Sequence, residues 1–283
     1  MKSSPAAMQL LFSFPALFFI AAFFMAPIGF LVVGSFFQKD PAGGVRLTLD
    51  VYRAVLGDAY NYGLLLRTVK LATIVTLVSF VIAFPVALYM RQLSARWQTV
   101  LTFILISPLL TSVVVRTLAW VIVLSPRGLV NNALASLGLP TATLLYNELG
   151  VVIGLTHVLL GYMVLALMVS VQKIDENQLL AAANLGASRF AIIREVVLPL
   201  SLPGVVAGSV LVFTMAASAY ATPMLLGGTK TKVAATEIYN LAIQYADWSS
   251  AAVLAIALFV MTAMVVLLGT VFSESGKRKV IFQ

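Results

Sequence analysis

Residues 172–199 read QKIDENQLLAAANLGASRFAIIREVVLP and form a polar stretch between two long apolar runs. Asp175 followed by Gln178 predicts a capping box at the start of a short Ala/Leu helix. Gly186 suits the turn that ends this helix, and Ser188 can cap a second helix. The segment therefore predicts a helix-turn-helix unit that is apolar on one face and projects from a membrane into water.

An exposed helix with an apolar face has two physical explanations. Its alanines allow close approach, and such a face fits a groove in a soluble partner. Alternatively, the segment lies on the bilayer surface as an amphipathic stretch. The residues alone leave both explanations open.

The composition of the whole chain is that of a membrane protein. Of its 283 residues, 61% are hydrophobic and 10% are charged, whereas a soluble domain carries about 25% charged residues. The formal net charge of +8 lies in short loops between apolar runs, which indicates membrane topology and anionic lipid rather than a nucleic-acid partner. The lack of cysteine excludes structural disulfides and thiolate metal sites. We expect a single transmembrane domain over residues 1–283.

Six apolar stretches approach or exceed the roughly 20 residues that a spanning helix needs. They lie at 10–37, 64–90, 99–125, 149–171, 200–226 and 249–273. The first exceeds the roughly 7–15 apolar residues of a cleavable signal peptide, so we expect it to stay as a spanning helix. The sequence therefore predicts an all-α membrane protein with six transmembrane helices and both termini on one side.

Lysine and arginine predict the orientation, because cytoplasmic loops carry more of them. One side holds Lys2, Arg91, Arg96, Lys173, Arg189, Arg194, Lys277, Arg278 and Lys279, and the other holds Lys39, Arg46, Arg53, Arg127, Lys230 and Lys232. We therefore expect a multi-pass inner-membrane protein with both termini and the 172–199 loop in the cytoplasm.

Several shorter features carry local predictions. Residues 47–56 and 128–137 are expected to form short helices in the outer loops. Asp247 is expected to cap the helix of the sixth span, although it could also attract a cation at the outer mouth. Gly204 and Gly208 form a Gly-xxx-Gly pair that permits close helix packing, for which we consider a subunit interface.

The 172–199 loop resembles the Glu-Ala-Ala coupling loop of binding-protein-dependent ABC importer permeases. The matching positions are Asp175, Ala181, Ala182, Gly186, Ala187, Ser188, Val196, Leu198 and Pro199. In that family the loop docks into a cytoplasmic ATPase, and here Pro199 would mark the entry into the fifth span. The glutamate of the motif is replaced by Leu180, so an acidic contact is missing or is supplied by Glu176 or Glu195.

Other segments resemble the spermidine/putrescine-type branch of these permeases. They are Arg67-Thr68, Arg116-Thr117-Leu118-Ala119-Trp120, Gly128-Leu129-Val130-Asn131 and the run from Tyr220 to Gly228. The resemblance implies the type I importer (MetI-like) architecture and polyamine as the first substrate to consider. It also implies a second permease of different sequence, an ATPase dimer that holds ATP and Mg²⁺, and a periplasmic binding protein.

Arg116 is the intramembrane charge to explain. Counting from Thr99 at about 1.5 Å per residue places it roughly 26 Å along the third span. An arginine at this depth is costly unless it faces protein or a water-filled path, so it either lines the path or snorkels to the outer interface. Trp120, Tyr162 and Tyr220 could contact an organic cation or simply pack, and Thr222 completes the candidate path.

No catalytic or metal site is predicted. His157 is the sole histidine, and a lone histidine without acidic or cysteine neighbours suits a hydrogen-bonded packing role better than a metal site. The Gly227–Lys230 stretch lacks the Gly-Lys pair of a P-loop, so no nucleotide site is expected. A self-sufficient secondary transporter or channel is the main alternative, but it predicts ion-coupling acids or an internal repeat. A membrane-embedded enzyme would need a polar catalytic cluster.

Overall fold

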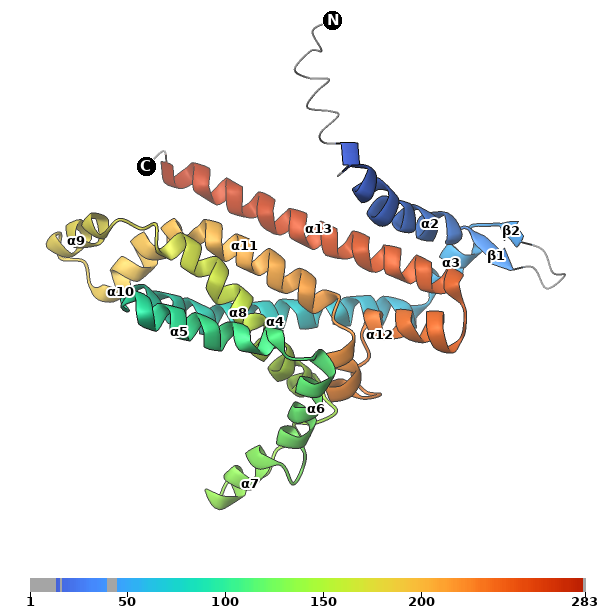
Figure 1. Cartoon of the computed structure of the whole chain (residues 1–283), viewed down its shortest axis with the longest axis horizontal. Coiled ribbons are helices and arrows are strands. Elements are labelled where there is room, and N and C mark those ends of the chain that lie inside the picture. Colours follow the sequence, from blue (N-terminus) through green and yellow to red (C-terminus); the bar gives the residue numbers. More distant parts are fainter. Residues whose placement is uncertain (1–13, 16, 40–44, 282–283) are drawn as a thin grey trace, which may run out of the picture. The chain divides into compact units, whose positions relative to one another are not determined.

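The computed structural model describes residues 14–15, 17–39 and 45–281 (Figure 1). Lys2 and the first residues of the predicted run from residue 10 lie outside this part. The chain divides into two compact units: Met1–Tyr62 with Glu237–Leu258, and Gly63–Thr236 with Phe259–Gln283. The single domain expected over residues 1–283 stays a prediction.

The first unit combines apolar helices with a small hairpin. Its elements are η1 (Ala21–Met25), α2 (Ala26–Gly34), β1 (Phe37–Lys39), β2 (Val45–Leu47), α3 (Asp50–Gly57), η5 (Asn240–Gln244) and the beginning of α13 (Trp248–Ile281). The two strands pair antiparallel, with Phe37 opposite Leu47. The Asp247 carboxylate accepts a hydrogen bond from the Ser250 N–H at 3.1 Å, which confirms it as the cap of α13.

The second unit contains most of the remaining helices. Its elements are α5 (Ala95–Ile106), η2 (Ser107–Leu110), α6 (Val113–Leu124), α7 (Leu129–Ser136), α8 (Glu148–Val171), α9 (Glu176–Asn184), α10 (Arg189–Ile192), η3 (Ile193–Val197), α11 (Leu198–Ala217) and η4 (Pro223–Gly227). Most of α4 (Ala59–Arg91) and the end of α13 belong to it, whereas α12 (Ala234–Tyr239) crosses the unit boundary. The helices α3 and α7 confirm the two short helices expected from the sequence, and their place on the outer side stays a prediction.

Helix α8 forms the centre of the second unit, and more than half of its apolar residues are buried. It packs closely against α11 because Gly204 and Gly208 face it. A Cβ atom at Gly204 would lie 2.7 Å from the Ala166 carbonyl oxygen, and one at Gly208 would lie 2.7 Å from the Met163 sulfur. The Gly-xxx-Gly pair therefore contacts a helix of the same chain, so the subunit interface that we considered for it was wrong.

Six helices among the described residues are long and apolar enough to span a membrane. They are Leu17–Gly34, Ala59–Arg91, Val113–Ser136, Glu148–Val171, Arg189–Ala217 and Trp248–Val271. This confirms the expected number of spans, although two boundaries differ from the sequence prediction.

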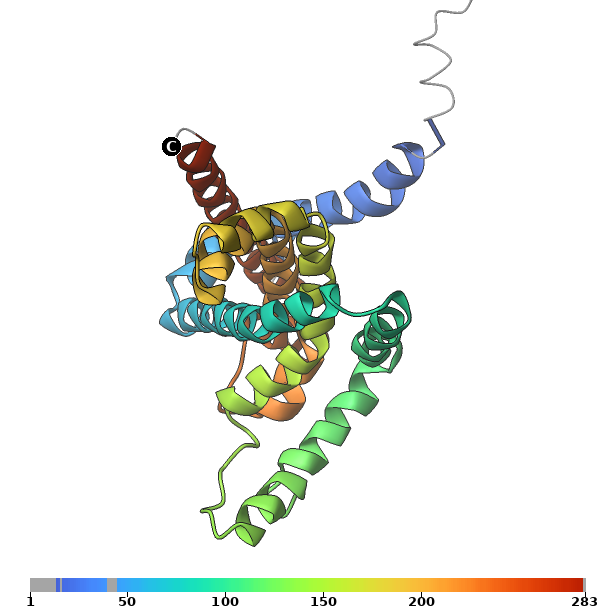
Figure 2. The same cartoon turned by 90° about the vertical axis from the view of Figure 1, so that its left-hand side faces the viewer.

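The third apolar run, 99–125, is not one continuous helix. Helix α5 tightens into η2 at Ser107, Thr111 then adopts extended backbone, and Ser112 is the N-cap of α6. Pro108 has no N–H to continue the helical ladder, which explains the change at this position. The chain changes direction between α5 and α6 in both views (Figures 1 and 2).

The fifth apolar run, 200–226, also divides. Helix α11 ends at Ala217, and η4 then begins at Pro223, a position where the missing N–H costs nothing. Ser218 bonds back to the Thr214 carbonyl through its N–H and its hydroxyl, which satisfies a carbonyl at the helix end. The predicted span is therefore shorter at this end, and Tyr220 lies in the turn rather than in the helix.

Candidate functional site

The 172–199 loop lies at one end of the second unit, where α9 and α10 extend beyond the ends of α8 and α11 (Figure 1). Asp175 is the N-cap of α9, and its carboxylate accepts a hydrogen bond from the Asn177 N–H at 3.0 Å. The Gln178 N–H bonds instead to the Asp175 carbonyl, at 3.2 Å. The predicted start of the helix is confirmed, with the side-chain bond at the second helical residue rather than the third.

Gly186 ends α9 in a Schellman motif. Its φ angle is +86°, a left-handed conformation that favours glycine. The Gly186 N–H bonds to the Ala183 carbonyl at 2.9 Å, and the Ala187 N–H bonds to the Ala182 carbonyl at 3.1 Å. These bonds fix the direction in which the chain leaves the helix.

Ser188 starts the second helix of the loop, as predicted, because its hydroxyl accepts a hydrogen bond from the Ala191 N–H at 3.2 Å. From Arg189 the helical path then continues through η3 into α11 as far as Ala217. Pro199 therefore causes no interruption on entry into the span. The preceding π-turn, in which the Leu198 N–H bonds to Ile193, is a geometry that accommodates the missing proline N–H.

The base of the loop is held to the transmembrane helices, whereas its outer surface is exposed. Arg91, at the end of α4, donates a hydrogen bond to the Ile174 carbonyl at 2.7 Å, and the Ile174 side chain is buried. Leu185 is 89% exposed and Phe190 73% exposed. Leu180, at the position of the motif's glutamate, is 55% exposed. Large exposed apolar side chains at the tip of an anchored loop are typical of a docking surface.

Arg116 lies at the break between α5 and α6. Its Nη1 donates to the Pro108 carbonyl, which belongs to η2. The same carbonyl also accepts a hydrogen bond from the Thr111 N–H at 3.4 Å, so Arg116 supplies a second donor at the end of η2. Arg116 therefore sits in the first turn of α6, and the position obtained by counting along an unbroken helix from Thr99 was wrong.

Other candidate path residues cluster next to Arg116. The Trp120 Nε1–H donates to His157 Nδ1 at 3.3 Å, and the two rings meet edge to face with centroids 5.3 Å apart. This bond leaves the proton of a neutral His157 on Nε2. The buried hydroxyls of Thr117 and Thr222 lie 3.3 Å apart, which joins α6 to the turn after α11.

Tyr162 and Tyr220 differ in their relation to this cluster. Tyr162 is partly buried against the core on α8. Tyr220 is half-buried in the turn between α11 and η4. The structure therefore brings Trp120 and His157 together beside the Arg116 turn of α6, while Tyr162 lies on α8 and Tyr220 lies in the turn after α11.

A charged cluster that sequence reasoning missed joins α4 to α8. The Lys70 ammonium is 2.6 Å from the Glu148 carboxylate, and the Arg67 guanidinium is 4.0 Å from it. Arg67 also donates to the Lys230 carbonyl at 3.3 Å. The sequence did contain a signal for this cluster. Two basic residues lie within four positions of each other at the edge of one span, and an acidic residue lies at the edge of another. Among the described residues, no group of three or more His, Cys, Asp or Glu side chains could hold a metal.

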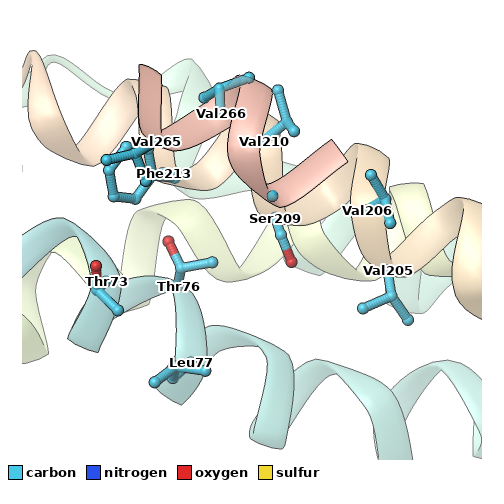
Figure 3. Close-up of a pocket in the computed structure, with 11 residues that line it drawn as sticks. Thr73, Thr76, Leu77, Val205, Val206, Ser209, Val210, Phe213, Val265 and Val266 are labelled. Carbon is cyan, nitrogen blue, oxygen red and sulfur yellow. The ribbon is translucent and has the colours of Figure 1, made fainter. Parts of the chain in front are cut away.

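An apolar hollow of about 310 Å³ lies between α4, α11 and α13 within the second unit. The hydroxyls of Thr76 and Ser209 point into the space between α4 and α11, while Val205, Val265 and their neighbours supply hydrocarbon (Figure 3). The Thr76 hydroxyl already donates to the Ala72 carbonyl. This hollow is therefore poorly suited to a polar solute.

Six spanning helices with an anchored, exposed helical loop between the fourth and fifth define the membrane-spanning subunit of a transporter. The family described as "Binding-protein-dependent transport system inner membrane component" matches residues 79–275, and the chain belongs to it. It is a multi-pass inner-membrane permease subunit of an ABC importer, and this membership excludes the self-sufficient transporter considered above.

Named relatives and solved structures agree with this assignment. The chain is 32% identical over 243 residues to the spermidine/putrescine transport system permease protein PotB of Salmonella typhimurium, covering 84% of both chains. It is 31% identical to PotB of Escherichia coli, covering 84% of this chain and 88% of that one. A bacterial ABC transporter for the polysaccharide alginate has a TM-score of 0.78 at 21% identity, covering 94% of this chain and 96% of that chain, which supports the fold.

Proposed function

We propose that this permease imports a polyamine, driven by a separate ATPase that binds the 172–199 loop. The polyamine assignment rests on the PotB relatives, which are named for spermidine and putrescine transport. The main support for the coupling proposal is the structure of the loop. Asp175, Gly186 and Ser188 define its two helices. The tip between them exposes Leu185 and Phe190.

The continuous helix from Arg189 to Ala217 supports a mechanical role for the loop. A helix transmits a displacement along its axis, so movement of α10 would reach the membrane-spanning part of α11 directly. ATP and Mg²⁺ would bind in the ATPase, closure of the ATPase dimer would move the loop, and the helices would alternate between outward and inward access. Asp175, Ala181, Ala182, Gly186, Ala187, Ser188, Leu198 and Pro199 are the proposed coupling residues.

The proposed assembly contains two permeases, two ATPases and a periplasmic binding protein. One of the solved neighbours is an alginate transporter in complex with its alginate-bound periplasmic protein, which is the kind of partner proposed here. Both termini and the 172–199 loop would face the cytoplasm, in agreement with the excess of lysine and arginine on that side.

The cluster around Arg116 is the proposed part of the translocation path in this subunit. The Trp120 ring is held by His157 and could contact a cationic solute through its π face. The Arg116 charge opposes a cation, however, and its bond to the Pro108 carbonyl gives it a positioning role. We therefore assign Trp120, Tyr162 and Tyr220 to solute contact, and Arg116 and the buried Thr222 to the shape of the path.

Pull-down of the tagged chain from gently solubilised membranes, followed by mass spectrometry, tests the coupling. The wild type should retain an ATPase and a second permease, whereas Ala182→Arg and Gly186→Arg should lose the ATPase. The matched control is Gly138→Arg, because Gly138 ends α7 with a φ angle of +71° and, like Gly186, has no atom within 4 Å of an added Cβ. A stable wild-type chain that recovers no ATPase would refute the coupling.

Competition of labelled spermidine uptake by putrescine and by unrelated solutes tests the substrate.

A further inference from the structure

A cavity of about 620 Å³ lies between the end of α4 and the inner side of the 172–199 loop. Three charged side chains line it: Arg91 from α4, Glu176 from α9 and Arg189 from α10. Most of the remaining lining is apolar and includes Leu88 and Val197. The cavity therefore combines two guanidinium groups and one carboxylate with a hydrocarbon wall.

This combination identifies the kind of ligand. Two arginines against one glutamate leave the lining with a net positive charge, and guanidinium groups bind phosphate oxygens in a fixed, paired geometry. A free inorganic anion would gain nothing from the apolar wall. A purely apolar molecule would leave the net positive charge of the lining uncompensated. An amphiphile with a phosphate head and a hydrocarbon chain satisfies both parts of the cavity.

The position of the cavity agrees with this chemistry. Arg91 is the last residue of the span Ala59–Arg91, and Arg189 is the first residue of the span Arg189–Ala217. Leu88 and Val197 lie on the membrane side of these arginines in their helices. Arginines therefore stand where a lipid headgroup region would be, and apolar side chains follow where acyl chains would be.

We propose that this cavity binds an anionic phospholipid, with its phosphate between Arg91 and Arg189 and an acyl chain against Leu88 and Val197. The proposal rests on the proposed orientation, in which this end of the helices faces the cytoplasmic leaflet. Basic pockets between helices at that surface attract anionic headgroups. The bound lipid would join the end of α4 to the loop, in addition to the hydrogen bond from Arg91 to the Ile174 carbonyl.

Lipid binding at this cavity leaves part of the proposed coupling surface free. At about 100° per residue, Ala181 lies about 140° around α9 from Glu176 and about 160° from Leu179. Glu176 and Leu179 line the cavity, whereas Ala181 and the 89% exposed Leu185 face elsewhere. The loop can therefore contact lipid on its inner side and a soluble partner on its outer side.

Native mass spectrometry of the full-length chain in detergent tests the proposal directly. Phosphatidylglycerol should be retained on the wild type, and phosphatidylcholine should be retained much less. Arg189→Gln should weaken phosphatidylglycerol binding by about five-fold, because one basic residue near a membrane surface contributes about that factor. Glu176→Gln should strengthen it, because the competing carboxylate is removed. Arg194→Gln is the matched control, since Arg194 is exposed on the adjacent turn and does not line the cavity.

Three outcomes would overturn the proposal. Equal retention of the two lipids would remove the charge requirement. Equal losses in Arg189→Gln and Arg194→Gln would indicate a general belt of lipid around a basic surface. Displacement by millimolar inorganic phosphate would identify a free anion as the ligand.

The opposite shift expected for Glu176→Gln guards against a folding defect, because misfolding does not increase binding. The measurement needs no ATPase, so failure of the proposed coupling would leave its result intact, and a reporter fusion at each terminus checks the orientation separately.

Discussion

The 172–199 loop and the break between α5 and α6 both redirect a helical chain, but different interactions hold them. In the loop, the Asp175 carboxylate, the Gly186 N–H and the Ser188 hydroxyl all bond within five residues. At the break, Arg116 reaches eight residues back to the Pro108 carbonyl. Thr117 in the same turn meets Thr222, which lies 105 positions further along the chain. A shape held by near neighbours keeps its form when it moves, whereas one held by distant partners depends on the positions of other helices.

The largest expected effect comes from the turn in the loop. Gly186→Val should reduce uptake by the assembled transporter at least ten-fold, because a β-branched residue disfavours a φ angle of +86° and the loop would lose its shape. Gly138→Val is the control, because the Gly138 N–H bonds to Ala135 and the Leu139 N–H to Leu134 in the same Schellman pattern. Each substitution should cost about 1–2 kcal/mol of local stability. If uptake fell equally in both, the loss would reflect stability rather than coupling.

These two regions also show which parts of the structure can be predicted from sequence. The caps at Asp175 and Ser188 and the turn at Gly186 follow from residue types a few positions apart, so the local form of the loop could be predicted. The number of spans follows from apolar length. The division of the run 99–125 could not be predicted, because Pro108 in an apolar stretch fits either a tolerated kink or a full break. The sequence does not show that Arg116 bonds to the Pro108 carbonyl, because that contact exists only in the folded chain.

The candidate path shows the same limit. Trp120 and His157 are 37 positions apart and on different helices, so nothing in the sequence pairs them. Gly204 and Gly208 predicted close helix packing. Their partner is α8 of the same chain, which only the folded structure identifies. The ion pairs of Glu148 with Lys70 and Arg67 likewise join the first residue of α8 to α4. Half-exposed ion pairs of this kind contribute at most about 1 kcal/mol to stability. The residue types alone therefore do not show which charged side chains will pair.

Arg116 offers the next test, because its two proposed relations to the path predict different measurements. Arg116→Leu should lower the stability of the detergent-solubilised chain by about 1.5 kcal/mol, the net value of a hydrogen bond that involves a charged group. Arg116→Lys should recover part of it, because an ammonium can make one bond to the Pro108 carbonyl. Thermal unfolding measures both. Unchanged stability with a changed half-saturation for uptake would contradict the positioning role and place Arg116 in contact with solute.

The Trp120–His157 pair should show a smaller effect. Trp120→Phe keeps an aromatic ring but removes the indole N–H, and His157→Ala removes the acceptor. Each should cost about 1 kcal/mol, and the double variant should cost less than the sum by about 0.5–1.5 kcal/mol, as expected of residues in direct contact. Thermal unfolding of the four chains measures this coupling energy. Simple additivity would mean that the bond contributes nothing and that the ring packing alone holds the two helices.

The smallest expected effect concerns the residue that departs from the coupling motif. Leu180→Glu introduces the acidic side chain that the related loops carry at this position. Leu180 is 55% exposed, so the substitution removes little buried area, and surface changes of this kind usually stay within about 0.5 kcal/mol. Uptake should therefore remain within about two-fold of the wild type, because the loop is shaped by Asp175, Gly186 and Ser188 rather than by this position. Measurement of uptake together with ATPase recovery separates two explanations. A large gain in recovered ATPase would mean that the missing carboxylate weakens docking, whereas a large loss would mean that the exposed leucine itself contacts the partner.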